Sequence, residues 1–394
     1  MTQRVLVTFP FAPSTPGGGT FDCIQLTRAM ARAGAEMTIA FVSSSGTAPF
    51  PRKPLSDEEL GRDLIEEIEA DGIRVMVVPP HKLNFRLDGL VLRRHIARML
   101  DKEPLDAVLG YWHEASFLDT LLRERGVAFG MNAAASFNQF LGEIPWTRPF
   151  LRMRNVLLRR PYQSADVIFA RSYFTRGEVS QVEGVDMQKV RVVYLGVDPR
   201  FARVQRPPAP KVTKLFYFGN LVASKGIFDA LEALGRVSRA GLCDWHFRVA
   251  GWGDPRPVMA AARRHGIESQ VETLGGLHRD RLAEELADSH LSILPSHTES
   301  FGLANAESQA AGVAVCAYGV AAVPEVVEDG VTGWLAPAGR VDLLALAISE
   351  AIRDPERAWR LGQAGRERIA TTFSWERAAR DTLAGLADAG RADF

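Results

Sequence analysis

Short apolar runs alternate with amphipathic stretches along the chain. The runs predict buried strands, and apolar residues at helical spacing predict helices between them. In the first half, strands are expected at 4–9, 37–42, 73–78, 107–110, 127–131, 167–170 and 190–194, and the clearest helices at 21–32, 87–100 and 117–125. Such alternation is typical of a parallel sheet that helices cover on both faces.

A proline-rich segment interrupts this pattern at residues 204–210, Val-Gln-Arg-Pro-Pro-Ala-Pro. Prolines at this density cannot continue a helix or a central strand, so the segment is predicted to be a linker. After it the alternation restarts, with strands expected at 215–218, 246–250, 271–274, 291–294 and 313–317 and closing helices at 355–371 and 374–388.

The restart predicts an α/β protein of two Rossmann-like domains that face each other across a cleft. Ligands of such sheets bind at the carboxyl ends of the strands. The expected limits are 1–203 for the first domain, 204–212 for the linker, 213–375 for the second domain and 376–394 for a helix that packs back on the first domain.

Composition and charge narrow the class of protein. The 394 residues suffice for two domains, and 46% hydrophobic with 24% charged residues is typical of a globular chain. A formal net charge of zero argues against a general nucleic-acid binder. No apolar run approaches the ~20 residues of a membrane helix, the first run is too short for a signal peptide, and the three cysteines lack metal-ligand spacing. We expect a cytoplasmic protein with reduced cysteines.

Glycine-rich turns follow three of the predicted strands. The first, at 15–20, contains Gly18 and Gly19 and opens a helix, where exposed N–H groups favour an anion. The second spans 219–226, and its Lys225 suits a diphosphate as a point charge. The third is Gly251-Trp-Gly253. The alternative is that these glycines only end parallel strands, since neither the dinucleotide fingerprint nor the Walker spacing is present.

Two glutamates flank a further turn, directly after the predicted strand 291–294. Glu299 and Glu307 lie on either side of Ser300-Phe-Gly-Leu303. In one interpretation Glu299 accepts hydrogen bonds from sugar hydroxyls, Glu307 from a ribose diol, and the N–H groups between them bind phosphate. In the other, Glu307 only complements a helix dipole and Glu299 is a surface residue. The pattern by itself leaves both open.

These motifs together resemble those of the retaining glycosyltransferases of family 4, which have the GT-B fold. That family combines a glycine…Lys-Gly loop, a strand ending in Gly-x-Gly, Pro-Ser before Glu-x-Phe-Gly, a later Glu, and Pro-Glu before a turn. The matching residues are Gly219, Lys225-Gly226, Gly251, Gly253, Pro295-Ser296, Glu299, Phe301-Gly302, Glu307 and Pro324-Glu325. The resemblance covers roughly residues 214–375 and extends more loosely to Gly17–Gly19.

The resemblance implies transfer from a nucleotide sugar with retention of the anomeric configuration. It implies that Lys225 binds the donor diphosphate, that Glu299 contacts the donor sugar and that Glu307 holds the ribose. Further donor-binding positions are Gly18, Gly19, Asn220, Gly251, Gly253, Ser300, Phe301, Gly302 and Leu303. A UDP-sugar is favoured, a GDP-sugar is the alternative, and no other cofactor is implied. No two aspartates are separated by a single residue, so the Asp-x-Asp metal motif of the other large glycosyltransferase fold is absent. We therefore expect metal independence.

Two positions depart from the family pattern. Asn220 stands where the family has Arg, which removes one positive charge near the diphosphate, and Asn132 stands where the family often has His. His113, in Tyr111-Trp-His-Glu114 after an earlier strand, is the candidate to take the role of that histidine as a third catalytic residue besides Glu299 and Lys225. The alternative is a structural histidine.

The acceptor side carries less information. Residues 144–165 contain five arginines among aromatic and aliphatic residues and no acid before 166, and the helix at 87–100 adds three more arginines. Basic amphipathic helices can lie on anionic lipid, which would suit a lipid-linked acceptor and peripheral contact with the inner face of a membrane. The alternative is an ordinary amphipathic helix with snorkelling arginines and a carbohydrate or small-molecule acceptor.

Three other functions compete with this one. A sugar-nucleotide epimerase would use the donor without an acceptor, and a non-catalytic partner subunit would bind nucleotide weakly, as Asn220 and Asn132 suggest. A dehydrogenase lacks its spaced dinucleotide fingerprint here. The sequence favours the glycosyltransferase, with a surface polysaccharide, glycolipid or small glycoside as its product.

Overall fold

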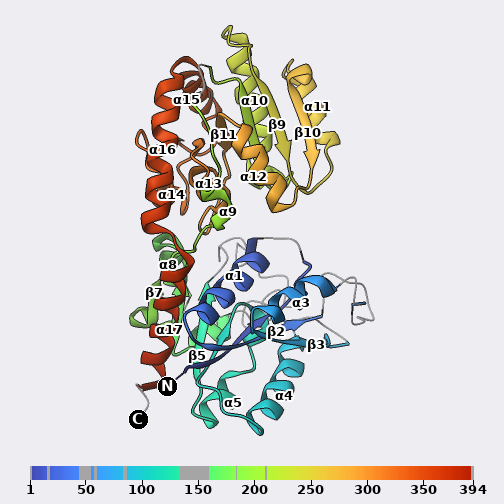
Figure 1. Ribbon diagram of the computed structural model, residues 1–394, viewed down its shortest axis with the longest axis vertical. Helices are drawn as coiled ribbons and strands as arrows, with labels where there is room; N and C mark the ends of the chain where they lie inside the picture. Colours follow the sequence, from blue (N-terminus) through green and yellow to red (C-terminus); the bar gives the residue numbers. More distant parts are fainter. Residues whose placement is uncertain are drawn as a thin grey trace, which may run out of the picture. The chain divides into compact units, whose positions relative to one another are not determined.

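The computed structural model describes residues 2–15, 18–43, 55–56, 60–82, 87–133, 159–182, 184–208 and 211–391. It divides into two compact units, Met1–Gly196 with Trp375–Phe394, and Val197–Ser374. In both units strands alternate with helices (Figure 1). The predicted α/β class, with two Rossmann-like sheets, is confirmed.

The first unit is built on a seven-stranded sheet with the order β3-β2-β1-β4-β5-β6-β7. All of its neighbouring strands are parallel, from β3–β2 through to β6–β7. Its elements are β1 (Arg4–Phe9), α1 (Gly18–Arg32), β2 (Glu36–Val42), α3 (Arg62–Ala70), β3 (Arg74–Val78), α4 (Asp88–Leu100), β4 (Ala107–Gly110), the 3-10 helix η2 (His113–Ala115), α5 (Asp119–Glu124), β5 (Ala128–Ala133), β6 (Val167–Ala170), α8 (Tyr173–Val179), η3 (Met187–Lys189), β7 (Val190–Val192) and α17 (Trp375–Arg391).

The second unit has a six-stranded parallel sheet with the order β10-β9-β8-β11-β12-β13. Helix α10 contacts α11 and α15, whereas α13 contacts α9 and α16, so both faces of the sheet are covered. Its elements are α9 (Pro199–Ala202), β8 (Lys214–Phe218), η4 (Ala223–Lys225), α10 (Ile227–Arg239), β9 (His246–Ala250), α11 (Arg256–Arg264), η5 (Glu268–Gln270), β10 (Val271–Gly275), α12 (Arg279–Asp288), β11 (Leu291–Leu294), α13 (Leu303–Ala310), β12 (Ala314–Tyr318), α14 (Val323–Val326), β13 (Gly333–Ala336), α15 (Val341–Arg353) and α16 (Pro355–Thr372).

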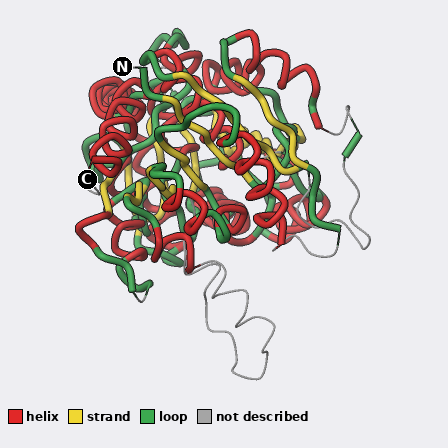
Figure 2. The backbone as a smooth tube through the Cα atoms, turned by 90° about the horizontal axis from the view of Figure 1, so that it is seen from below, coloured by secondary structure: helices red, strands yellow, loops and turns green. Residues whose placement is uncertain are grey.

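The core of each unit lies between its sheet and its helices. Strands β4, β6, β11 and β12 are buried along their whole length. A parallel strand that is covered on both faces reads as a continuous apolar run, which is why these strands were predictable. The tube in Figure 2 shows the strands enclosed by helices.

Helix α17 completes the first unit although it comes last in the sequence. It packs against α1 and β5. The approach is close enough to require glycine at Gly196, where a Cβ atom would lie 2.3 Å from the backbone nitrogen of Trp375. The last helix of the chain is thereby fixed to the sheet that contains its first strand, β1.

The structure adds one strand and shifts some limits. Strand β13 was not predicted, because its four residues begin with glycine and follow a turn. The predicted strand 190–194 ends at Val192. Of the expected features, Gly17 and most of the arginine-rich stretch 144–165 lie outside the described residues.

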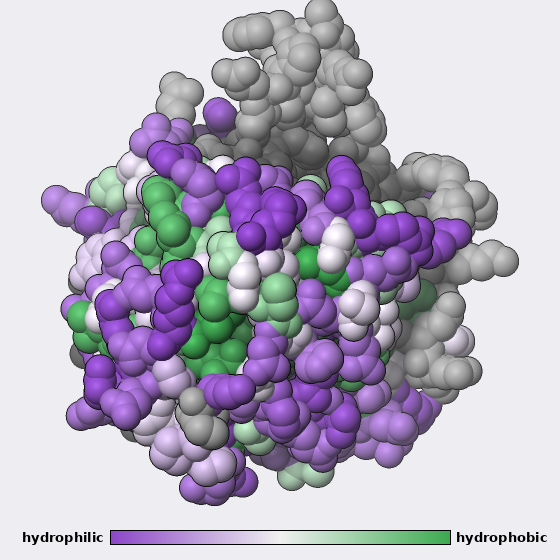
Figure 3. Space-filling view, turned by 90° about the horizontal axis from the view of Figure 1, so that it is seen from above, coloured by the Kyte–Doolittle hydropathy of each residue, from purple (hydrophilic) through white to green (hydrophobic). Residues whose placement is uncertain are grey.

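The surface is mainly hydrophilic on the face drawn in Figure 3, with hydrophobic residues in a few separate patches. Among the helices that the structure describes, none combines the length and apolar character needed to cross a membrane.

Candidate active site

An ion pair joins two loops at the carboxyl edge of the second sheet. Lys225 ends η4, which follows β8, and Glu299 lies in the loop after β11. The Lys225 Nζ and Glu299 Oε1 atoms are 2.7 Å apart, and the two side chains are 35% and 16% exposed. Because β8 and β11 are neighbours in the sheet, their carboxyl ends bring these residues together from 74 positions apart.

The same two loops are held against each other by backbone contacts. The His297 amide donates to the Ser224 carbonyl at 2.9 Å. Gly226 has a φ of 72°, and a Cβ atom there would lie 1.8 Å from the Pro295 carbonyl oxygen. Only glycine permits this approach, so the Lys-Gly motif fixes the position of the lysine.

Helix α13 begins at the end of the Glu299 loop. Its N-cap is Gly302, with a φ of 95°. Phe301 is buried, and its ring packs edge-on against Phe373 with 5.5 Å between the ring centroids. The Glu299 carbonyl accepts a hydrogen bond from the Ala322 amide at 3.1 Å. The first-turn N–H groups of α13 therefore follow Glu299 within a few residues. N–H groups at the start of a helix favour a bound anion.

Glu307 is the fifth residue of α13, beyond its first turn, and lies almost fully buried. It pairs with the Arg279 guanidinium at the start of α12. Arg279 also bonds the Asp198 carboxylate through Nε at 3.0 Å and lies over the Phe201 ring, 5.2 Å from its centroid. Burial raises the pKa of Glu307, and the charge of Arg279 opposes that rise. A position in mid-helix with a buried ion pair does not fit the interpretation of Glu307 as a helix-dipole residue.

The glycine turns after β8 and β9 pack on each other. A Cβ atom on Gly251 would lie 1.7 Å from the Gly219 carbonyl oxygen. Gly253 has a φ of 137°, and the Leu221 amide donates to the Trp252 carbonyl at 2.9 Å. The close packing of the two turns requires these glycines, in line with the alternative that the glycines only end parallel strands. Asn220 lies between Gly219 and Leu221 and is exposed.

Trp252, the middle residue of that motif, is 60% exposed. Its ring lies against the backbone of Gly276, where a Cβ atom would come within 2.5 Å of the ring. Gly276 comes three positions before Arg279 in the loop between β10 and α12. One face of a large aromatic ring is thus supported while the rest is open to a ligand.

The carboxyl edge of the first sheet is buried instead. His113 and Glu114 form η2 and are 5% and 0% exposed. Glu114 accepts hydrogen bonds from Thr8 Oγ1 at 3.1 Å and from the Tyr111 amide at 2.9 Å. Burial raises the pKa of Glu114 to about 7 against these hydrogen bonds. Asn132, near the end of β5, is fully buried, and neither its amide nitrogen nor its amide oxygen has a hydrogen-bond partner within the described part of the chain.

A buried ion pair lies at the same edge. Arg171 follows β6 and contacts Asp22 of α1, with Nη2 and Oδ2 2.8 Å apart. Arg171 also donates to the Tyr111 hydroxyl at 3.1 Å. Burial raises the pKa of Asp22 to about 6 in spite of the charge of Arg171.

The predicted site residues therefore fall in both units. Gly18 and Gly19 open α1 and are exposed, and His113 also lies in the first unit. The remaining predicted residues, including Ser300 and Leu303, lie at the carboxyl edge of the second sheet. Within the described ranges no three His, Cys, Asp or Glu side chains gather as they would around a metal ion.

Sequence reasoning missed the partner of Glu307. Neither Arg279 nor Asp198 stands in any of the motifs that carry the resemblance. Arg279 lies 28 positions from Glu307 and 81 from Asp198. The available signal was its place after a predicted strand of the second sheet, where ligand-binding loops gather.

Comparison with known families gives two matches that together span most of the chain. Residues 16–201 match Glycosyltransferase Family 4, and residues 200–368 match Glycosyl transferases group 1. Glycogen synthase of Mycobacterium tuberculosis is 26% identical over 410 residues, which cover 96% of this chain and 92% of that protein. D-inositol 3-phosphate glycosyltransferase of Segniliparus rotundus is 31% identical over 235 residues, 56% of this chain and 51% of that protein.

Solved structures share the fold at low identity. Sucrose-phosphate synthase from Thermosynechococcus elongatus has a TM-score of 0.76 at 18% identity and covers 97% of this chain and 98% of its own. Anabaena HepE in complex with UDP and glucose has a TM-score of 0.75 at 17% identity and covers 98% of this chain and 100% of its own. These findings confirm the resemblance, the GT-B fold and the class of enzyme. The chain belongs to family 4 of the glycosyltransferases, the glycosyl transferases group 1, and transfers a sugar from a nucleotide sugar.

Proposed function

We propose that this enzyme transfers the sugar with retention of configuration and without a metal ion, to a saccharide, lipid-linked or small-molecule acceptor. The observation that carries the proposal is the 2.7 Å contact between Lys225 Nζ, at the end of η4, and Glu299 Oε1, in the loop that leads into α13. A cation, a carboxylate and a helix N-terminus are the three kinds of group that a sugar diphosphate needs. The partner subunit rests only on Asn220 and Asn132, and the epimerase has no specific observation in its favour.

Lys225 and Glu299 have complementary roles in this proposal. In the free protein each neutralises the other. The diphosphate of an incoming donor draws Lys225 as a point charge, and Glu299 then accepts hydrogen bonds from hydroxyls of the donor sugar. As the sugar departs, negative charge grows on the diphosphate, and Lys225 with the N–H groups of Phe301, Gly302 and Leu303 stabilises it, a contribution of about 3 kcal/mol for one such donor.

Glu307 is the proposed ribose ligand. Its burial disfavours the charged carboxylate, and Arg279 offsets that penalty, so that Glu307 can accept from two ribose hydroxyls. Arg279 is accordingly a positioning residue in this proposal. Ser300 would contribute to the same loop, and Gly219, Asn220, Gly251 and Gly253 would admit the phosphates close to the backbone.

The nucleobase is the part of the donor that Trp252 would contact. Stacking on an aromatic ring is worth about 1–3 kcal/mol per base and does not depend on base identity. Trp252 packs against Gly276, three positions before Arg279, so its ring lies beside the loop that leads to the proposed ribose site. UDP is the favoured nucleotide, in line with the HepE complexes with UDP and with UDP-glucose, and GDP is the alternative.

In the first unit the proposal keeps His113 as the candidate for the family histidine, with Gly18 and Gly19 as candidate donor contacts at the start of α1. His113 is buried in the same turn as Glu114, whose carboxylate accepts hydrogen bonds from Thr8 and from the Tyr111 amide. A cytoplasmic enzyme with peripheral membrane contact would suit a lipid-linked acceptor.

Calorimetric titration without metal tests the proposal. The purified chain is titrated with UDP, GDP, ADP and their common sugar conjugates. Micromolar binding of one nucleotide, weakened at least tenfold by Lys225→Ala and unchanged by the surface control Lys211→Ala, is the expected result. Absence of binding across the panel, or equal binding by Lys225→Ala, would remove Lys225 from the site.

A further inference from the structure

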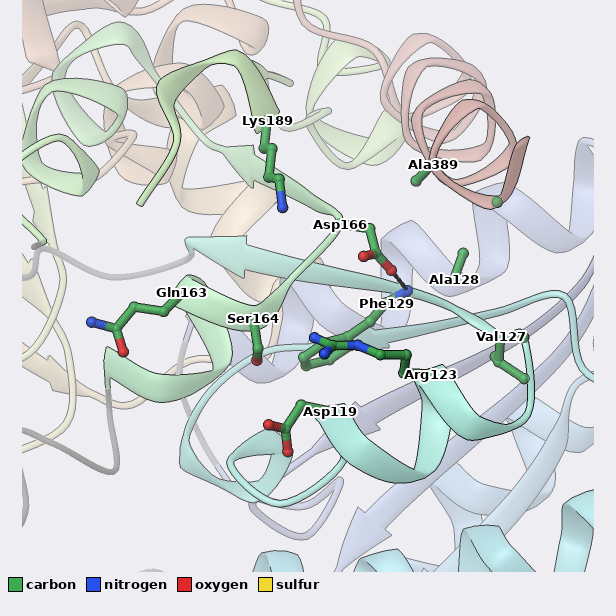
Figure 4. Close-up of a pocket in the computed structure, with 12 residues that line it drawn as sticks. Asp119, Arg123, Val127, Ala128, Phe129, Gln163, Ser164, Asp166, Lys189 and Ala389 are labelled. Carbon is green, nitrogen blue, oxygen red and sulfur yellow. Dashed lines mark hydrogen bonds between the residues drawn. The ribbon is translucent and has the colours of Figure 1, made fainter. Parts of the chain in front are cut away.

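A cavity of about 610 Å³ opens at the amino edge of the first sheet. It lies where β5, β6 and β7 begin, between α5 and the last turn of α17 (Figure 4). Its size falls within the roughly 300–1,000 Å³ that is usual for small-molecule sites. All of its lining residues belong to the first unit.

The cavity is distinct from the candidate active site. It is lined by Ala128, the first residue of β5, whereas Asn132 lies at the other end of that strand. Four steps of about 3.3 Å separate the two residues by roughly 13 Å. Lys225 and Glu299 lie in the second unit. None of the residues assigned to the donor lines the cavity.

The polar groups of the lining are balanced between donors and acceptors. Donors come from Arg123, Lys189 and Gln163, and acceptors from Asp119, Asp166 and Ser164. Two positive and two negative side chains give no net formal charge. An anion would meet two carboxylates and a cation would meet an ammonium and a guanidinium, so neither fits. Hydroxyl groups both donate and accept, and a neutral molecule that carries several of them can satisfy every group of this lining.

Several of these side chains are held in place yet keep bonding capacity. Asp166 accepts from the Phe129 amide at 2.8 Å, the dashed line in Figure 4. Asp119 pairs with Arg160 at 3.0 Å, and Lys189 Nζ donates to the Ala165 carbonyl at 3.3 Å. A carboxylate has about four acceptor sites and an ammonium three donors, so groups of this kind can bond more than one partner.

Arg123 is the least committed of them. It reaches from α5 across the lining in Figure 4, and with the described residues it makes no ion pair. Its five N–H donors in a fixed fork suit pairs of adjacent hydroxyls. Together these groups form a preset frame of donors and acceptors around an open volume.

We propose that this cavity is a second carbohydrate site, which binds a neutral saccharide apart from the reacting donor. The site itself does not depend on the roles proposed for Lys225 or Glu299. Only the choice of a saccharide among neutral polyols rests on membership of a sugar-transferring family. Such a site would hold a saccharide acceptor or product on the enzyme while its end reacts elsewhere.

Saturation-transfer difference NMR on the full chain tests the proposal, with glucose, galactose, mannose and maltose as probes. Ala389→Trp fills the cavity from α17, and Arg123→Gln removes the guanidinium. Ala384→Trp is the matched control, because Ala384 is exposed on the same helix and does not line the cavity. Glu299→Ala controls for sugar held at the donor site.

We expect at least one probe to give signals that fall at least fivefold in Ala389→Trp and in Arg123→Gln and persist in Ala384→Trp and Glu299→Ala. No signal from any probe in the wild type would overturn the proposal, as would signals that persist in Ala389→Trp or vanish in Glu299→Ala. Suppression by inorganic phosphate would show an anion site instead. If the melting temperature shows that Ala389→Trp does not fold, the signals of Arg123→Gln alone decide whether the cavity binds the saccharide. Nucleotide titration of the same samples tests the donor site separately.

Discussion

The carboxyl edges of the two sheets both carry ion pairs, but one set is open and the other closed. In the second unit, Lys225 and Glu299 are 35% and 16% exposed. In the first unit, Arg171 and Asp22 are 1% and 4% exposed. An open cation can exchange its carboxylate for a ligand, whereas a closed pair must keep its partner. The comparison assigns ligand exchange to the second edge and a fixed frame to the first.

The pKa values support this division. Burial outweighs the attraction of Arg171 and raises the pKa of Asp22 to about 6, and burial also raises that of Glu114 to about 7. Groups whose charge is so costly in the folded state are poor candidates for repeated exchange with a ligand. The hydrogen bonds that Glu114 accepts from Thr8 and from the Tyr111 amide, and the one that Arg171 donates to the Tyr111 hydroxyl, instead fix the ends of β1 and β4.

The largest expected effect comes from breaking the closed pair. Arg171→Met leaves the Asp22 carboxylate buried without its cation, and loss of one partner of a buried pair costs about 3–5 kcal/mol of the free energy of unfolding. Urea denaturation of wild type and variant measures this loss. Arg125→Met is the matched control, since it breaks an exposed pair with Asp101 and should cost at most about 1 kcal/mol. Equal losses in the two variants would refute the distinction between closed and open pairs.

The open edge should respond in activity and not in stability. Glu299→Ala removes the carboxylate that is proposed to hold the donor sugar, and we expect transfer to fall at least about 100-fold, as when one stabilising contact of a transition state is lost. The free energy of unfolding should change by less than about 1 kcal/mol, because the pair is partly solvated. Initial rates with a saturating donor check the first expectation. Glu272→Ala, exposed on β10, should keep full activity; retained activity in Glu299→Ala would exclude the residue from the site.

The pH dependence of stability separates the two edges further. The pKa of Glu114 is raised from 4.5 to about 7, so the folded state binds this proton more tightly than the unfolded chain does. Its contribution to stability is complete below about pH 4.5 and is lost as the pH rises through about 7. Glu114→Gln keeps an uncharged group at every pH. Between pH 5 and pH 8 the wild type should therefore lose on the order of 2 kcal/mol more than this variant.

Denaturation curves of both proteins at pH 5, 6, 7 and 8 measure that difference. Glu124→Gln, a change at the end of α5 on an exposed residue, serves as the control and should follow the wild type. Parallel pH profiles of wild type and Glu114→Gln would show that the Glu114 carboxyl titrates normally and is not part of a closed frame.

The same contrast explains what the sequence could predict. Strands that are buried on both faces, such as β8 and β11, read as mainly apolar runs, and the turns that hold Lys225 and Glu299 follow them directly. Local motifs therefore sufficed to name Lys225, Glu299 and Glu307 as candidate site residues. Partners far apart in sequence were not: Asp22 and Arg171 are 149 positions apart.

Those pairings depend on which strands become neighbours, and no local pattern records it. The order β1-β4-β5-β6 brings Tyr111, Asn132 and Arg171 to one edge, although they lie at the ends of three different strands. β13 was missed for a different reason, since a four-residue strand that begins with glycine gives too little periodicity to detect.

The smallest expected effect is the coupling between Lys225 and Glu299 themselves. A double-mutant cycle of Lys225→Ala, Glu299→Ala and the double variant should give a coupling free energy of about 0.2–1 kcal/mol in unfolding, the range of exposed pairs. Solvent screens both charges, and ordering two mobile side chains opposes their attraction. In nucleotide binding the two substitutions should differ: Lys225→Ala weakens UDP, which lacks the sugar, whereas Glu299→Ala leaves UDP affinity within about twofold. A coupling above about 3 kcal/mol in unfolding would make this pair a structural contact like that of Asp22 and Arg171. It would contradict the assignment of ligand exchange to the second edge.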